Sequence, residues 1–192
     1  AFAMAGTFKA IRHRLDVLGV LVLGFVTAMG GGVIRDALLQ RTPFVFLDNG
    51  PAFFSLLGCV LASAWHAVAE PLKTQREERA FLFVDGVGLA VFAVTGARLG
   101  TEAGLTTWSV VLLAALTGVG GGAIRDMLVR EVPLVLHADF YATAALIGGL
   151  VYAVLDRLGV PVPLTSLAAF GVTLVLRTMA IWRGWHLPRL TR

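Results

Sequence analysis

Long apolar runs alternate with short polar stretches along the whole chain, and most of the runs are long enough to cross a lipid bilayer as a helix. The first run ends near Phe8, and six more lie at about 17–40, 52–69, 80–98, 107–129, 138–155 and 164–182. The pattern predicts an all-α membrane protein with seven transmembrane helices.

One uncommon motif occurs twice, 90 residues apart. The segment GGGVIRD at 30–36 recurs as GGGAIRD at 120–126. When residues 2–62 are placed on 92–152 without a gap, 19 of the 61 pairs are identical, so the similarity extends well beyond the motif. Each repeat holds three predicted spans, an odd number, and the second repeat must therefore cross the membrane in the inverted orientation.

The repeat also predicts the domain organisation. We expect a single transmembrane domain over 1–192, with repeat one at about 1–69, repeat two at about 80–155 and a seventh helix at about 164–182. The short first run corresponds to the complete span 80–98, which predicts that about ten residues precede Ala1 in the intact protein.

Composition and charge support a membrane protein and argue against other classes. The chain is 57% hydrophobic and 15% charged, with a mean hydropathy of +0.82, which is too apolar for a soluble domain of this length. The net charge of +4 does not indicate a nucleic-acid partner, because the cations lie at the ends of apolar runs. No enzyme motif is present, so we expect no catalysis and no cofactor, only permeant K⁺ or Na⁺.

The distribution of the loop cations predicts the orientation in the membrane. One side of the predicted spans carries Lys9, Arg12, Arg14, Lys73, Arg76, Arg79, Arg130, Arg183, Arg189 and Arg192. The other side carries only Arg41, Arg98 and Arg157. The positive-inside rule therefore predicts a multi-pass protein of the plasma membrane, with its N-terminus outside and its C-terminus in the cytoplasm.

Both motifs place glycines inside apolar runs, where they weaken a helix. They could interrupt or bend the helix and open a polar route, or allow tight helix packing; their doubling at mirrored positions favours the first interpretation. We therefore predict pore-lining helix breaks at Gly30, Gly31, Gly32, Gly120, Gly121 and Gly122. One turn earlier, Thr27 and Thr117 either offer hydroxyls to a passing ion or bond their own helix backbone.

Charged residues are also predicted inside the membrane, at Arg35, Asp36, Asp85, Arg125 and Asp126. With the glycines at the midplane and a rise of about 1.5 Å per residue, the two arginines lie about 12 Å apart in depth, so each needs a partner at its own level. Asp85 matches the depth of Arg125, and the two are predicted to form a buried pair. The alternative is that Asp85 snorkels or caps its helix.

Two further residues are candidates for a pore mouth. Asp139 precedes the sixth span, where its carboxylate could attract cations or only cap the helix, as Asn49 would at the equivalent position of repeat one. Lys9 lies just beyond the first span and is interpreted as a positive-inside anchor or as a contact with anionic lipid.

These motifs resemble those of a known family. The doubled GGGxIRD segments, the FAxxG segments that begin at Phe2 and Phe92, and DGVGLAVFA at 85–93 resemble prokaryotic trimeric intracellular cation (TRIC) channels over essentially the whole chain. The resemblance implies a homotrimer of seven-span protomers. It also implies a pathway for monovalent cations, chiefly potassium, inside each protomer, lined by the two glycine-bent helices.

Two functions from different classes remain open. A passive cation channel needs a continuous polar path, whereas a carrier for a small molecule such as glycine, the function often ascribed to bacterial relatives with this motif, needs a closed midplane site. The resemblance favours the channel, with membrane lipids and monovalent cations as partners. Animal members carry a lysine before the glycines that is linked to phosphoinositide binding, but Met29 and Val119 stand there in this chain.

Overall fold

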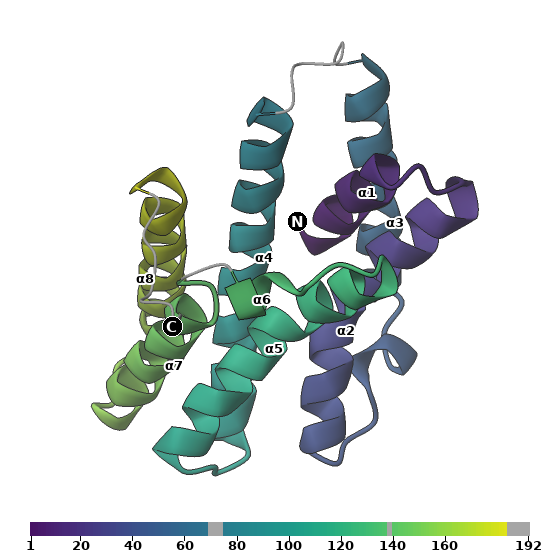
Figure 1. The fold of residues 1–192 in the computed structure, drawn as a ribbon. Helices are drawn as coiled ribbons and strands as arrows, with labels where there is room; N and C mark the ends of the chain where they lie inside the picture. Colours follow the sequence, from purple (N-terminus) through teal and green to yellow (C-terminus); the bar gives the residue numbers. More distant parts are fainter. Residues whose placement is uncertain (69–74, 138–139, 184–192) are drawn as a thin grey trace, which may run out of the picture.

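The computed structural model describes residues 1–68, 75–137 and 140–183, and within these residues it contains helices and no strand (Figure 1). The elements are α1 (Phe2–Arg12), α2 (Val17–Leu38), the 3-10 helix η1 (Phe44–Phe46), α3 (Gly50–Val68), α4 (Gln75–Glu102), α5 (Thr107–Leu128), α6 (Leu134–His137), α7 (Ala142–Arg157) and α8 (Val162–Arg183). Helices α2, α3, α4, α5 and α8 contain stretches long and apolar enough to cross a membrane. The chain is therefore an all-helical membrane protein.

The two motif-bearing helices begin and end in the same way. Asp16 caps the first turn of α2 by accepting a hydrogen bond from the backbone of Gly19 at 2.7 Å. Thr106, its equivalent 90 residues later, caps α5 in the same manner. Past their C-terminal ends, Gln40 and Arg130 adopt left-handed backbone angles, with φ of 53° and 59°. Matched start and stop signals thus give two helices of 22 residues each.

Helix α5 lies at the centre of the molecule. In Figure 1 it runs between α1, α2 and α3 on one side and α4, α7 and α8 on the other. Helix α1 packs on α2, and its equivalent α4 packs on α5. The main apolar core is formed by α4, α5, α7 and α8, and alanines such as Ala93, Ala114 and Ala145 allow these helices to approach closely.

Candidate functional site

The two glycine motifs meet where α2 crosses α5. A Cβ atom on Gly31 would collide with the carbonyl oxygen of Thr117, and one on Gly121 would collide with that of Thr27. The Cβ position on Gly31 also lies 3.4 Å from the backbone nitrogen of Gly121. Because the two backbones are in direct contact, the middle glycines form a helix-packing contact that no larger residue fits.

Neither motif interrupts its helix, so of the two predicted effects, an interruption or a bend, the interruption at 30–32 and 120–122 is wrong. Helix α2 is continuous from Val17 to Leu38, and α5 from Thr107 to Leu128. Figure 1 shows that α2 nevertheless changes direction near its middle, and that α5 does so more gently. Glycine costs a helix about 1 kcal/mol per residue relative to alanine, and close packing between the two helices offsets this cost.

The two threonines before the glycines are engaged with their own helices. The hydroxyl of Thr27 donates to the carbonyl oxygen of Leu23 at 2.5 Å, and that of Thr117 donates to Leu113 at 2.6 Å. Both threonines are fully buried. The interpretation in which they bond their own backbone is therefore confirmed, and in this conformation their hydroxyls do not face an open path.

In each motif the arginine pairs with the aspartate that follows it, and this aspartate also binds the backbone of the next segment. The Nε atom of Arg35 donates to Oδ1 of Asp36 at 2.9 Å, and Oδ2 of Asp36 accepts a hydrogen bond from the backbone of Phe44 at 2.8 Å. The equivalent atoms 90 residues later make the same two contacts, both at 2.9 Å. Each aspartate thus neutralises the arginine before it and holds the start of η1 or α6.

The predicted pair between Asp85 and Arg125 is confirmed. Nη1 of Arg125 lies 2.6 Å from Oδ1 of Asp85, and neither side chain has exposed surface. Arg125 also contacts Asp126 at 2.9 Å, and its guanidinium lies 4.9 Å from the ring centroid of Phe81. One buried arginine therefore serves two carboxylates and an aromatic ring, which compensates for its removal from water.

Lys9 is not a surface anchor, so both interpretations of it as an anchor or a lipid contact are wrong. It is 6% exposed, and its Nζ lies 2.5 Å from Oε2 of Glu131 and 3.5 Å from Oδ1 of Asp126. His13 contacts the other oxygen of Glu131 at 2.6 Å. Burial opposes the charge on Glu131, but the hydrogen bonds from Lys9 and His13 outweigh it and hold the pKa of Glu131 below its ordinary value.

Sequence reasoning missed Arg177 and Tyr141. Arg177 lies within α8, is 3% exposed, and places its guanidinium 4.8 Å from the ring centroid of Tyr141. Its side chain also reaches Gly86, next to Asp85. The available signal was a single arginine inside the seventh apolar run, since a charge at such a position has a functional or pairing role by default.

These side chains form one charged cluster, which consists of Lys9, Asp85, Arg125, Asp126, Glu131, Tyr141 and Arg177. Four of its buried atoms have no hydrogen-bond partner of acceptable geometry among the described residues: Oδ2 of Asp85, Nη2 of Arg125, the hydroxyl of Tyr141 and Nε of Arg177. Such atoms are rare in folded proteins, so this arrangement is a candidate functional site.

The unpartnered atoms gather beside the third glycine of the second motif. A Cβ atom on Gly122 would lie 3.0 Å from the Tyr141 hydroxyl and 3.5 Å from Nη2 of Arg125. The equivalent position on Gly32 instead faces the ring of Phe44. Polar surroundings are therefore found at the third glycine of the second motif and not at that of the first. Asp139, the predicted pore-mouth residue, lies outside the described residues. Within residues 1–68, 75–137 and 140–183, no three His, Cys, Asp or Glu side chains converge as metal ligands.

Several known proteins are similar in sequence to this chain. The family model described as "Glycine transporter" matches residues 1–67 and 82–157. The UPF0126 inner membrane protein YadS of Escherichia coli K12 is 40% identical over 187 residues, which cover 97% of this chain and 88% of YadS. The UPF0126 membrane protein YvgT of Bacillus subtilis is 37% identical, with 98% and 90% covered.

Solved structures of TRIC channels have the same fold. One TRIC cation channel is 39% identical, with a TM-score of 0.85 over 100% of this chain and 92% of its own. The TRIC orthologue from Rhodobacter sphaeroides is 34% identical, with a TM-score of 0.83 over 96% and 93%. These relatives are membrane proteins and channels rather than enzymes. The chain therefore belongs to the TRIC channel family of membrane proteins, which the matching family model describes as glycine transporters.

Proposed function

We propose that this protein is a monovalent cation channel, permeable to potassium, whose ion path runs inside each protomer of a homotrimer. The solved TRIC cation channels, at 34% to 39% identity, support this class of function. In this chain, the observation that carries the proposal is the charged cluster beside the α2–α5 crossing. The formal charges of three cations and three carboxylates cancel in this cluster, and all of these side chains except Glu131, at its edge, are buried. Charges at such positions mark ion pathways in membrane proteins.

Conduction requires the charged cluster to open. Its unpartnered atoms lack exposed surface in this conformation, so water does not reach them. Small displacements of α7 and α8 from α4 and α5 would hydrate Asp85 and Tyr141, whose free oxygens then replace part of the hydration shell of a passing cation. Because two such oxygens do not form a rigid carbonyl cage, the path selects cations over anions but discriminates weakly between potassium and sodium.

The membrane topology forms part of the proposal. Helices α1 and α7, with 11 and 16 residues, complete the five longer candidate spans to seven. The charge distribution of the loops then orients the N-terminus outside and the C-terminus in the cytoplasm. In this orientation the Lys9–Glu131 contact lies at the cytoplasmic end of the path.

Single-channel recording tests the proposal. Purified protein in a planar bilayer under asymmetric KCl should give unitary current steps. Their reversal potential should have the same sign as the equilibrium potential of potassium. The Asp85→Asn, Arg125→Gln double variant should change the unitary conductance, whereas Arg157→Gln, which removes an exposed arginine far from the cluster in sequence, should not. A reversal potential that follows chloride contradicts the proposal.

A second candidate, a carrier for a small zwitterion, rests on the chemistry of the same unpartnered atoms. Nη2 of Arg125 and Nε of Arg177 are free donors that suit a carboxylate, and Oδ2 of Asp85 is a free acceptor that suits an ammonium group. The family model is described as a glycine transporter. Saturable glycine uptake into proteoliposomes without unitary currents would favour the carrier over the channel.

A further inference from the structure

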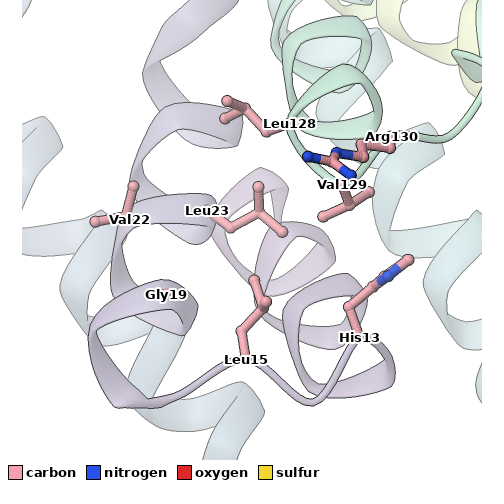
Figure 2. Close-up of a pocket in the computed structure, with 8 residues that line it drawn as sticks. All are labelled: His13, Leu15, Gly19, Val22, Leu23, Leu128, Val129 and Arg130. Atoms are coloured by element: carbon pink, nitrogen blue, oxygen red, sulfur yellow. The ribbon is translucent and has the colours of Figure 1, made fainter.

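A groove of about 310 Å³ lies between the start of α2 and the end of α5, and its His13 end adjoins Glu131 at the edge of the charged cluster (Figure 2). Its lining consists of His13, Leu15, Gly19, Val22, Leu23, Leu128, Val129 and Arg130. Figure 2 shows the polar groups of His13 and Arg130 at one end and Val22 at the other. The groove is therefore amphipathic along its length, and it is open to the surface because Val22 and Leu128 are 48% and 56% exposed.

Two arginines beside this groove occupy a strained backbone conformation. Arg14, in the turn between two lining residues, has φ of 54°, and Arg130 has φ of 59°. A residue other than glycine is uncommon in this left-handed region. At the position equivalent to Arg14, repeat two has Gly104, with φ of 70°, which is the ordinary solution to such a turn. A guanidinium in the turn next to the groove is thus retained despite its conformational cost.

The symmetry-related position, between the start of α5 and the end of α2, supplies an internal comparison for the whole groove. Its equivalents of the apolar lining residues are apolar as well: Leu105, Leu112, Leu113, Leu38 and Leu39. Its equivalents of Arg12, His13, Arg14 and Arg130 are Glu102, Ala103, Gly104 and Gln40. The apolar part is therefore common to both positions, whereas the four basic residues occur only at this groove.

The carboxylates near the groove are already occupied. Oδ1 of Asp16 accepts a hydrogen bond from the backbone of Gly19, and Glu131 is held by Lys9 and His13. Unlike these carboxylates, Arg130, the arginine that lines the groove, is not engaged in an ion pair among the described residues, and it is exposed. A cationic end remains available for an anionic group.

We propose that this groove binds one anionic phospholipid, with an acyl chain along the apolar lining and the phosphate at Arg130 and the neighbouring Arg14. Both arginines lie at helix ends, the level at which lipid headgroups sit, and on the side where the positive-inside rule places the cytoplasm. If these two arginines only set the membrane topology, their positive charge would be sufficient. Neither a groove beside them nor a left-handed backbone conformation would be needed. The site lies at helix ends and not at the glycine motifs, and it is independent of whether the protein is a channel or a carrier.

Native mass spectrometry of the purified protein tests the proposal, with dioleoylphosphatidylglycerol and dioleoylphosphatidylcholine as probes. The wild type should retain the anionic lipid more strongly than the zwitterionic one. Arg130→Gln should weaken retention of phosphatidylglycerol by about fivefold, the value expected for one cation near an anionic headgroup. Arg14→Gly with Arg130→Gln should remove the preference between the two lipids.

The substitutions are chosen to preserve the fold, since Gly104 and Gln40, the residues equivalent to Arg14 and Arg130, already adopt the same left-handed conformation. The unfolding temperature without added lipid should therefore match that of the wild type. Arg157→Gln is the control for loss of one exposed arginine and should leave lipid retention unchanged. Excess inorganic phosphate should not displace the lipid, because phosphate lacks the acyl chain that fills the groove. Equal retention of both lipids by the wild type, or undiminished phosphatidylglycerol binding in the double variant, overturns the proposal.

Discussion

Nη1 of Arg125 lies 2.6 Å from Oδ1 of Asp85, with both side chains fully buried. This contact joins α4 to α5 within the charged cluster. Because a buried pair exchanges hydration for mutual attraction, its net contribution is small, but each partner depends strongly on the other. The contact is therefore expected to control both stability and the opening of the path.

The first prediction concerns this pair. Arg125→Gln alone should lower the free energy of unfolding by about 3–5 kcal/mol, since it leaves the buried carboxylate of Asp85 uncompensated, whereas Asp85→Asn should cost less, because Arg125 keeps its contact with Asp126. The double variant should lose less than the sum of the two. Thermal unfolding in detergent, analysed as a double-mutant cycle, measures the coupling. The exposed Arg98–Glu102 pair, at 2.7 Å, is the control and should show about 0.3–0.5 kcal/mol. Additive losses at Asp85 and Arg125 would contradict the coupling.

The second prediction concerns the helix crossing. Gly31→Ala and Gly121→Ala each place a methyl group against a carbonyl oxygen of the opposite helix, and should destabilise the protein by about 1–3 kcal/mol. Gly171→Ala in α8 is the control, because a Cβ there meets nothing within 4 Å and alanine favours a helix by about 1 kcal/mol. Unfolding temperatures should therefore move in opposite directions. Wild-type stability in Gly31→Ala, with transport lost, would assign the glycines to the path and not to packing.

The third prediction concerns pH. Folding lowers the pKa of Glu131 through its contacts with Lys9 and His13, so the unfolded chain binds this proton more readily than the folded chain does. The contact therefore stabilises the protein fully above the ordinary glutamate pKa of about 4.3, and this stabilisation is lost as the pH falls from that value through the lowered pKa of the folded protein. Glu131→Gln should lower the unfolding temperature near neutral pH, and its difference from the wild type should shrink as the pH falls through the pKa of Glu131 in the folded protein. A difference that does not depend on pH would show that Glu131 acts through packing alone.

The fourth prediction concerns Tyr141. Its hydroxyl is buried near the carboxylate of Asp85 but makes no hydrogen bond of good geometry among the described residues, so Tyr141→Phe should change the free energy of unfolding by less than about 1 kcal/mol. If that oxygen serves a permeating cation, the same variant should alter the unitary conductance. Tyr152→Phe, which is equally buried but lies outside the cluster, is the control and should leave the conductance unchanged. Identical currents in wild type and Tyr141→Phe would remove Tyr141 from the path.

Local pattern was sufficient to predict several parts of this protein. Apolar runs located the long helices, because a helix in a membrane must bury or shield its backbone within one continuous apolar stretch. Depth matching predicted the Asp85–Arg125 contact, because a regular rise per residue converts sequence position into height in the membrane. The repeat showed that each motif would occupy an equivalent position.

Other features depended on contacts between helices, which no single helix reveals. The sequence left open whether Gly31 breaks its helix or allows it to pack against another helix. The structure decided for packing, because the backbone at Gly121 fills the space that a break would have exposed. The sequence alone indicated that Lys9 is a surface anchor. The acidic residues that Lys9 contacts, Asp126 and Glu131, lie more than a hundred residues away along the sequence.

The asymmetry between the repeats was settled in the same way. The two motifs are nearly identical in sequence, yet Gly32 faces a phenylalanine ring while Gly122 faces a polar cluster completed by Tyr141 and Arg177. Arg177 comes from α8, which has no counterpart in the first repeat. The sequence by itself thus determined the helices, the repeat and the presence of buried charge. The tertiary structure decided which charges meet, because charge pairing depends on distances between helices that only packing sets.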